Sequence, residues 1–230
     1  MPTPPRPGAP RPGAPRPGAP KPGPRAAPPP PGARKRGGTL LTRAKNMLLQ
    51  PGAEWQVIAG EFTTVGAIYR GYVLRLAALP AVCRIIGYTI WGIPALYGGT
   101  IHVSATTALK GGVAFYVAQL IAVYALALVI DGLAPTFGGT SNRVQAVKVS
   151  AYACTASWVA GPFVMVPGGQ WLADLLGLYS LYLFYTGLTP VMKSSRDKVI
   201  GYAVLTNVAA IFFYIVIKAL TTVFLPPVTV

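Results

Sequence analysis

The chain has 230 residues, of which 53% are hydrophobic and only 11% charged, against roughly 25% charged residues in a typical soluble domain. Its net charge of +15 comes from 20 Lys and Arg against 5 Asp and Glu. This leaves too little polar surface to coat a water-soluble globule, and the basic residues gather in a tail and at the ends of apolar segments. The composition therefore excludes an ordinary soluble domain, argues against nucleic acid as a partner, and favours an integral membrane protein.

Residues 1–39 form a predicted disordered, basic, proline-rich tail. Fifteen of the 24 prolines lie in residues 1–31, where a low-complexity five-residue unit repeats from Arg6. Proline removes backbone donors and the unit has no large apolar side chain, so we expect an extended, partly polyproline-like chain. The cluster Arg34, Lys35 and Arg36 ends the tail and favours binding to anionic lipid headgroups. The alternative is a proline-motif ligand for a partner domain.

Residues 40–70 are predicted to be an interfacial amphipathic segment. A short helix is expected to begin after Thr39 as N-cap and to end before Pro51. Arg43 and Lys45 lie off its apolar face, which makes them candidates for binding lipid or a partner. Trp55 is expected at the membrane interface. The glutamates that follow, Glu54 and Glu61, are expected to be solvated or paired with local arginines.

Five apolar stretches in residues 71–225 predict five transmembrane helices, and hence an all-α polytopic bundle. They are placed at about 72–95, 111–130, 144–167, 171–192 and 199–224. Each is long enough at 1.5 Å per residue to cross a hydrocarbon core of roughly 30 Å. The third and fourth are separated only by Pro167-Gly168-Gly169, which predicts an antiparallel hairpin.

The charges of the links orient this bundle. The basic links are the tail, residues 131–143 (followed by Lys148 just inside the third span) and residues 193–198, with Arg143, Lys193, Arg196 and Lys198. The alternate links, 96–110 and 168–170, contain only Lys110. Because Lys and Arg concentrate on the cytoplasmic side, we predict a cytoplasmic N-terminus and an outer C-terminus.

Three polar side chains stand out within the spans: Arg84, Asp174 and Asn207. A charge inside the membrane is costly, so we hypothesise an ion pair between Arg84 and Asp174. The alternative is that Arg84 lines a path for an ion or a substrate. Asn207 is expected to hydrogen-bond between helices.

Small residues recur every four positions on the third span, at Ala153, Ser157 and Gly161. This spacing favours close packing of one helix on another.

No catalytic constellation is recognisable. The single histidine, His102, lies in a predicted outer link, and no metal-ligand spacing, paired-carboxylate motif or phosphate-binding loop is present. Cys83 and Cys154 both lie inside apolar runs. We therefore predict a protein that is not an enzyme and has no cofactor.

Three stretches of the chain, over about residues 41–215, resemble bacterial members of the Yip (Ypt-interacting protein) domain family. The first holds Arg43-Ala44-Lys45-Asn46-Met47-Leu48-Leu49, Glu54-Trp55, Glu61 and Leu76-Ala77-Ala78-Leu79-Pro80-Ala81. The second holds Leu133-Ala134-Pro135-Thr136-Phe137-Gly138-Gly139 and Ala151-Tyr152. The third holds Gly177-Leu178-Tyr179, Leu181-Tyr182-Leu183, Met192-Lys193 and Gly201-Tyr202.

The resemblance implies a five-span helical bundle with a cytoplasmic N-terminus. Eukaryotic relatives are associated with small GTPases and membrane shaping, but their Asp-Leu-Tyr-Gly-Pro motif is only faintly echoed by Asp131 and Pro135. GTPase binding is therefore not implied. Arg75 and Arg84 also depart from the usual apolar first span, and the repeat tail lies outside the resemblance.

Two functions remain open. The first is a non-enzymatic membrane-organising or adaptor protein of the bacterial inner membrane, whose partners are anionic lipids and either another membrane protein or a second copy of itself. The second is a small transporter or channel that uses Arg84, Asp174 and Asn207.

Overall fold

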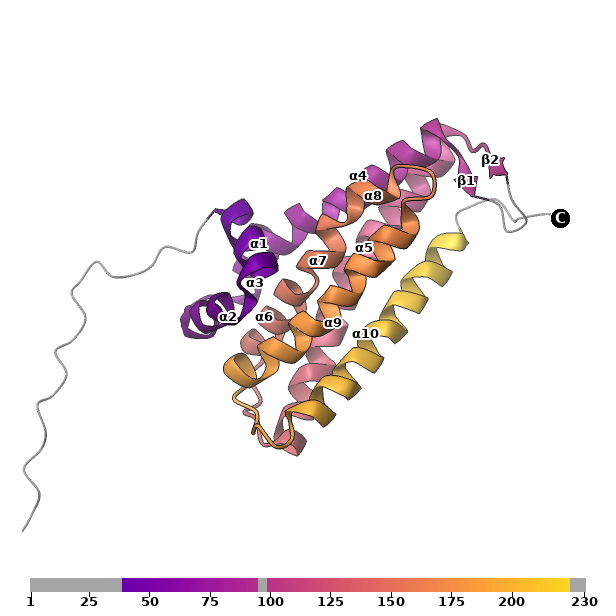
Figure 1. Cartoon of the computed structure of the whole chain (residues 1–230). Helices are drawn as coiled ribbons and strands as arrows, with labels where there is room; N and C mark the ends of the chain where they lie inside the picture. The colour runs from indigo at the N-terminus through magenta and orange to yellow at the C-terminus, as the bar shows by residue number, and fades with distance from the viewer. Residues whose placement is uncertain (1–38, 95–98, 224–230) are drawn as a thin grey trace, which may run out of the picture. The chain divides into compact units, whose positions relative to one another are not determined.

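The structure is a computed structural model that describes residues 39–94 and 99–223 (Figure 1). The predicted tail, apart from Thr39, and its cluster Arg34, Lys35 and Arg36 therefore lie outside the described residues. The helices are α1 (Leu40–Leu49), α2 (Pro51–Gly60), α3 (Val65–Ile68), α4 (Leu74–Ile90), α5 (Ala105–Leu133), α6 (Arg143–Ala153), α7 (Thr155–Val159), α8 (Gly161–Val164), α9 (Gln170–Met192) and α10 (Val199–Thr222). A π-helical turn, η1 (Tyr69–Val73), joins α3 to α4, and a 3-10 turn, η2 (Ala134–Phe137), extends α5.

Four helical stretches in the described part of the chain are long and apolar enough to cross a membrane. They are Val65–Ile90, Ala105–Phe137, Gln170–Met192 and Val199–Thr222, with mean hydropathies of 1.6, 2.4, 1.3 and 2.1. The outward faces of α5 and α10 carry side chains such as Ile121, Leu128, Val208 and Phe212, all exposed. Lipid is the environment in which such faces are stable. The predicted all-helical membrane bundle is confirmed.

The third predicted span, 144–167, differs from the other four because it is broken into α6, α7 and α8. The hydroxyl of Thr155 donates to the carbonyl of Tyr152 at the first break, which competes with the regular helical hydrogen bond. Pro162 stands in the first turn of α8 and has no N–H to continue the ladder. The three pieces still follow one another along α9. None of them is long enough to count as a span, so the described residues contain four candidate spans where five were predicted.

The turn between α8 and α9 forms the predicted antiparallel hairpin. Gly168 has a positive φ of 77°, which a glycine adopts without strain. A side chain at Gly169 would place its Cβ 1.9 Å from the carbonyl oxygen of Phe163. Glycine at both positions thus lets the chain reverse within a very short link.

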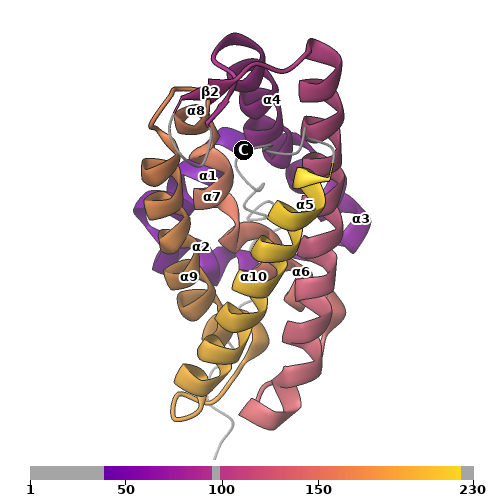
Figure 2. The same cartoon turned by 90° about the vertical axis from the view of Figure 1, so that its right-hand side faces the viewer.

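The bundle is organised around α5 and α9. Helix α5 packs against α4, α6 and α10, whereas α9 packs against α2, α6, α7 and α10. Figure 2 shows α10 running between α5 and α9. The link after α4 carries a two-residue hairpin, in which β1 (Ile93–Pro94) pairs antiparallel with β2 (Thr100–Ile101).

The N-terminal helices α1 and α2 belong to the same compact unit as the bundle. The expected helix start and stop are confirmed: the Thr39 side chain accepts a hydrogen bond from the N–H of Thr42, and Pro51 opens α2 after α1 has ended. Helix α2 contacts α9, and α1 contacts α6 and α7. We call α1 and α2 together the N-terminal hairpin.

Candidate functional site

A buried ionic cluster holds the N-terminal hairpin together. Arg43 on α1 is only 5% exposed. Its Nη1 donates to Glu61 Oε2 at 3.0 Å and its Nε lies 3.7 Å from Glu54 Oε1. Asn46 Nδ2 donates to the other carboxylate oxygen of Glu54 at 3.0 Å. Both carboxylates are therefore paired with Arg43. This is one of the two alternatives predicted from the sequence, the other being that the glutamates are solvated.

The surroundings of Arg43 favour its charged form. Burial opposes the charge, but the hydrogen bond with Glu61, together with the nearby Tyr152 and Glu54, outweighs it and raises the pKa of Arg43. The guanidinium also lies 5.3 Å from the centre of the Tyr152 ring. Arg43 is thus a structural cation of the hairpin.

This corrects the prediction that Arg43 binds lipid headgroups or a partner. Its side chain is directed inward to the carboxylates of Glu54 and Glu61, which a helical-face argument limited to α1 could not anticipate. Lys45, two residues later, is exposed and remains a candidate.

Lys148 on α6 is a second buried cation, and it joins the hairpin to the bundle. It is 1% exposed, and its Nζ donates to the carbonyl oxygens of Ile58 at 2.8 Å and Glu61 at 2.6 Å. These carbonyls lie at the C-terminal end of α2, where helix carbonyls have no partner within the helix and cations are favoured. Sequence reasoning used Lys148 only as an orienting charge and missed this role.

Trp55 docks α2 onto α9. It is fully buried, which corrects its predicted place at the membrane interface. Its Nε1 donates to Thr186 Oγ1 at 3.1 Å. A Cβ added at Gly187 would lie 2.7 Å from the indole ring. The ring therefore packs closely on α9 at the position where Gly187 has no side chain.

The three intramembrane polar candidates do not come together. Arg84 on α4 donates through Nη1 to the hydroxyl of Tyr88 at 2.8 Å, and its guanidinium lies 4.3 Å from the Phe115 ring centre. Asn207 Nδ2, on α10, donates to the carbonyl of Leu181 on α9 at 3.4 Å. Asn207 also lies far along α10 from Lys218, the lysine near the end of that helix. The two residues are eleven positions apart, or roughly 16 Å at 1.5 Å per residue.

The hypothesised ion pair between Arg84 and Asp174 is not formed. Asp174 Oδ1 instead accepts hydrogen bonds from Tyr214 at 2.9 Å and from Gln170 at 2.8 Å. Asp174 is exposed on α9, whereas Arg84 is buried between aromatic rings. Neutral donors close to Asp174 therefore satisfy the acid, and the arginine is held elsewhere.

The comparisons with known proteins agree with this membrane architecture. A family model described as the Yip1 domain matches residues 45–217. The chain is a member of the Yip1 domain family. It is 27% identical over 187 residues to "Inner membrane protein YohC" of Escherichia coli strain K12, a match covering 80% of this chain and 95% of that protein. YohC of Escherichia coli O6:H1 matches to the same extent. No solved structure gives a significant match.

The N-terminal hairpin lies almost wholly inside the Yip1 domain. The match begins at Lys45, so it includes the second half of α1, all of α2, both glutamates and Lys148, but not Arg43. The hairpin is therefore an integral element of this multi-pass membrane domain, while residues 1–44 precede the match.

The small residues of the third span contact two different helices of the Yip1 domain. Ser157 Oγ lies 2.8 Å from Ser180 Oγ on α9. A Cβ at Gly161 would lie 2.6 Å from the Pro80 Cα, so α8 and α4 approach closely there. Ala153 is fully buried. In this structure these positions serve packing within the bundle.

Proposed function

We propose that this Yip1 domain protein is a non-enzymatic organising or adaptor protein of a bacterial inner membrane. Its basic N-terminal tail faces the cytoplasm and binds anionic lipid headgroups or another membrane protein. The observation that carries the proposal is the N-terminal hairpin, which Arg43, Lys148 and Trp55 fix rigidly to the bundle. The tail precedes this element directly in the sequence.

The outward face of the hairpin has the composition of a surface that lies in a lipid headgroup region. Leu41, Lys45 and Leu49, which are four residues apart on α1, are exposed, as are Gln56 on α2 and Phe62 just after it. Amphipathic helices that bind membrane surfaces combine apolar and basic side chains in this way. The faces of α5 and α10, by contrast, are apolar.

The level of the hairpin supports an action on one leaflet. The Tyr179 hydroxyl donates to the carbonyl of Leu48, and Trp55 donates to Thr186. These positions lie thirteen and six residues before the end of α9 at Met192, or roughly 20 and 9 Å by helical rise. The hairpin therefore lies beside the middle of α9 and the part that runs on to the basic link.

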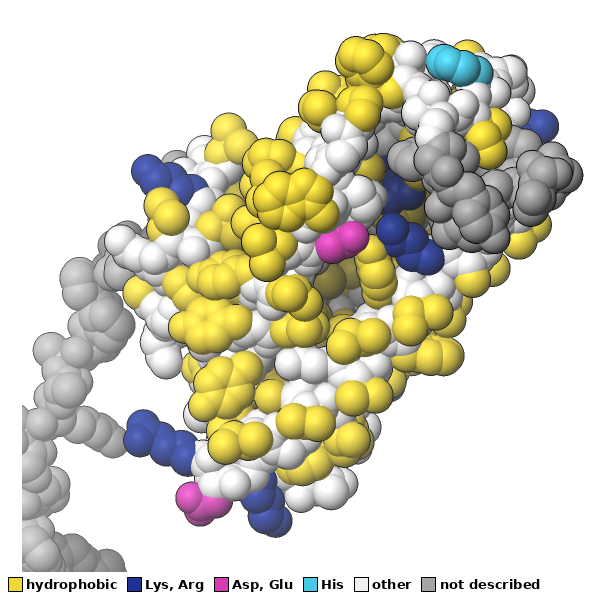
Figure 3. Space-filling view, turned by 45° about the vertical axis from the view of Figure 1, so that its right-hand side comes forward, with side chains coloured by type: hydrophobic (Ala, Val, Ile, Leu, Met, Phe, Trp, Pro, Cys, Tyr) yellow, Lys and Arg dark blue, Asp and Glu magenta, His cyan; other side chains and the backbone are white. Residues whose placement is uncertain are grey.

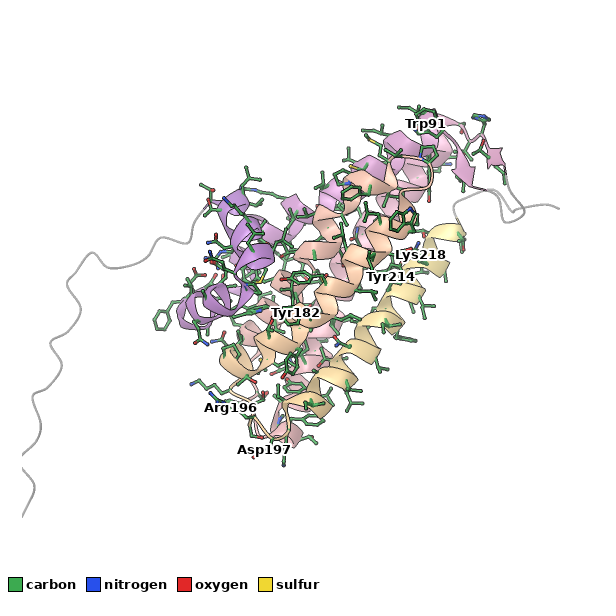
Figure 4. The ribbon with its side chains drawn as sticks, viewed as in Figure 1. Trp91, Tyr182, Arg196, Asp197, Tyr214 and Lys218 are labelled. Carbon is green, nitrogen blue, oxygen red and sulfur yellow. The ribbon has the colours of Figure 1, made fainter. Side chains whose placement is uncertain are left out.

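Charge supports a cytoplasmic position for that end. Lys193, Arg196 and Lys198 form the link after α9, and Figure 4 shows Arg196 at the end of the bundle opposite Trp91. Positive side chains concentrate in cytoplasmic links. The name of the Escherichia coli relative, an inner membrane protein, is consistent with the proposed compartment.

The rival function, a transporter or channel, receives less support from the geometry. It required Arg84, Asp174 and Asn207 to act along one path, and these three side chains hydrogen-bond to different neighbours.

The lipid part of the proposal is tested by measuring enrichment of fluorescent phosphatidylglycerol around the full-length protein in vesicles. Each basic residue near an anionic surface contributes about 1 kcal/mol. Replacing Arg34, Lys35 and Arg36 with Gln should therefore reduce enrichment strongly. The matched control replaces Lys193, Arg196 and Lys198 with Gln. An equal reduction by both triple variants would mean that total charge, and not the tail, attracts the lipid.

The adaptor part is tested by purifying the protein from its own membrane in mild detergent and identifying bound proteins by mass spectrometry. A stoichiometric partner that disappears when residues 1–39 are deleted would support an adaptor. Liposome flux that depends on Arg84 would instead favour the transporter.

A further inference from the structure

The end of the bundle opposite the basic link contains a cavity of about 250 Å³. It lies among the C-terminal half of α4, the turn between α8 and α9, and the last turns of α10. Its lining includes Arg84, Tyr88, Trp91, Met165, Gln170 and Lys218. Figure 3 shows Lys and Arg side chains in a hollow beside an acidic one, and Figure 4 shows Lys218 near the end of α10.

Arg84 brings unused donors to this cavity. It is 8% exposed, and within the described residues it makes one side-chain hydrogen bond, to Tyr88. Its Nε is buried and has no hydrogen-bond partner there. A guanidinium has five N–H groups, and a buried donor without a partner is rare enough in proteins to require an explanation, such as a bound ion or water.

Lys218 adds a second positive charge from a different helix. Its Nζ lies 5.2 Å from the centre of the Tyr214 ring. No carboxylate of the described residues lies within 4.0 Å of either Lys218 or Arg84, because the ion pairs there involve only Arg43 and Arg143. The nearest acid is Asp174, which accepts hydrogen bonds from Tyr214 and from the lining residue Gln170 and forms no ion pair with either cation. Two cations thus converge on one partly apolar cavity with no carboxylate in ion-pair contact, an arrangement that is costly at membrane depth.

We propose that this cavity binds a phosphate group. Arg84 presents a planar fork that matches phosphate oxygens, and Lys218 contributes a compact charge. Tyr88 and Gln170 belong to the same lining. The volume is smaller than that of most drug-sized pockets, and it suits a group of headgroup size. The phosphate can come from an anionic phospholipid or from free phosphate in water.

The lipid source is tested on the full-length protein in detergent with native mass spectrometry, using phosphatidylglycerol and, for comparison, phosphatidylethanolamine. A high salt concentration screens charges in water more than charges in a cavity. Arg84→Gln and Lys218→Gln should each weaken phosphatidylglycerol retention by roughly tenfold or more, the usual effect of losing a charged hydrogen bond. Lys110→Gln is the matched control, because Lys110 is exposed near the start of α5 and does not line the cavity.

The free-phosphate source is tested by the thermal stability of delipidated protein with inorganic phosphate alone. Stabilisation that both cavity variants abolish would support the site with free phosphate as its ligand. Retention of phosphatidylglycerol and stabilisation by phosphate that are both insensitive to Lys218→Gln would overturn the proposal. Lys218 decides the test if Arg84→Gln does not fold, because Lys218 is only partly buried and makes no ion pair with the described residues.

Discussion

Replacing Arg43 with Met should destabilise the N-terminal hairpin more than any surface substitution on the same helix does. The substitution keeps an apolar stem but leaves Glu54 and Glu61 without their cation. Breaking a buried ion pair from one side costs about 3–5 kcal/mol. The Glu54 side chain is 9% exposed and that of Glu61 is 23% exposed, so water can reach Glu61. We therefore expect a loss near the lower limit, about 3 kcal/mol.

The assay is reversible unfolding by SDS in mixed micelles, followed by tryptophan fluorescence, with hydrogen exchange of residues 40–61 to locate the change. Lys45→Met is the matched control, since it makes a similar change of charge at an exposed site of α1 and should cost under about 0.5 kcal/mol. A combined variant with Glu54→Gln and Glu61→Gln should recover part of the loss, because removing all the charges leaves none unpaired. Equal losses for Arg43→Met and Lys45→Met would refute this reasoning.

Two further predictions concern the docking of the hairpin. Lys148→Met should speed hydrogen exchange at the C-terminal end of α2, because the carbonyls of Ile58 and Glu61 lose their shared donor; unchanged protection would contradict the capping role. Gly187→Ala should destabilise the protein by about 1–3 kcal/mol in the same SDS titration, because the new Cβ would lie 2.7 Å from the Trp55 ring. Gly177→Ala on the same helix is the control, since its nearest neighbouring atom is 3.7 Å away, and equal effects of the two would argue against close docking.

The sequence predicted the bundle well because its signals are local. Long apolar runs identify α5, α9 and α10 whatever their neighbours are, and links of five to fourteen residues make successive helices antiparallel. The boundaries were less accurate. The first span was placed at 72–95, whereas the helical stretch is Val65–Ile90, because Arg70 and Arg75 lower the local hydropathy. The second helical stretch begins at Ala105, whereas it was predicted to begin at 111, because Lys110 and the threonines before it are polar.

The N-terminal hairpin was predicted only in part, because its contacts are distant in sequence. A helix after Thr39 and pairing of the glutamates with local arginines were expected, but the docking on the bundle was not. Arg43 meets Glu61 eighteen residues later, and Trp55 meets Thr186 131 residues later. Helical periodicity alone assigns an arginine to the polar face and a tryptophan to an interface, and it carries no information about partners on other helices. The break at Thr155 was missed for a similar reason, since a Thr within an apolar run is compatible with an unbroken helix.

The way each inward-facing cation is satisfied separates structural charges from candidate binding groups. Arg43 has two carboxylates, and Lys148 has two carbonyl oxygens at a helix end, so both are neutralised by the fold. Arg84 and Lys218 have aromatic rings beside them but no acid within ion-pair distance among the described residues. Because a charge without a compensating partner is costly inside a membrane, Arg84 and Lys218 are the two that the proposed phosphate would neutralise.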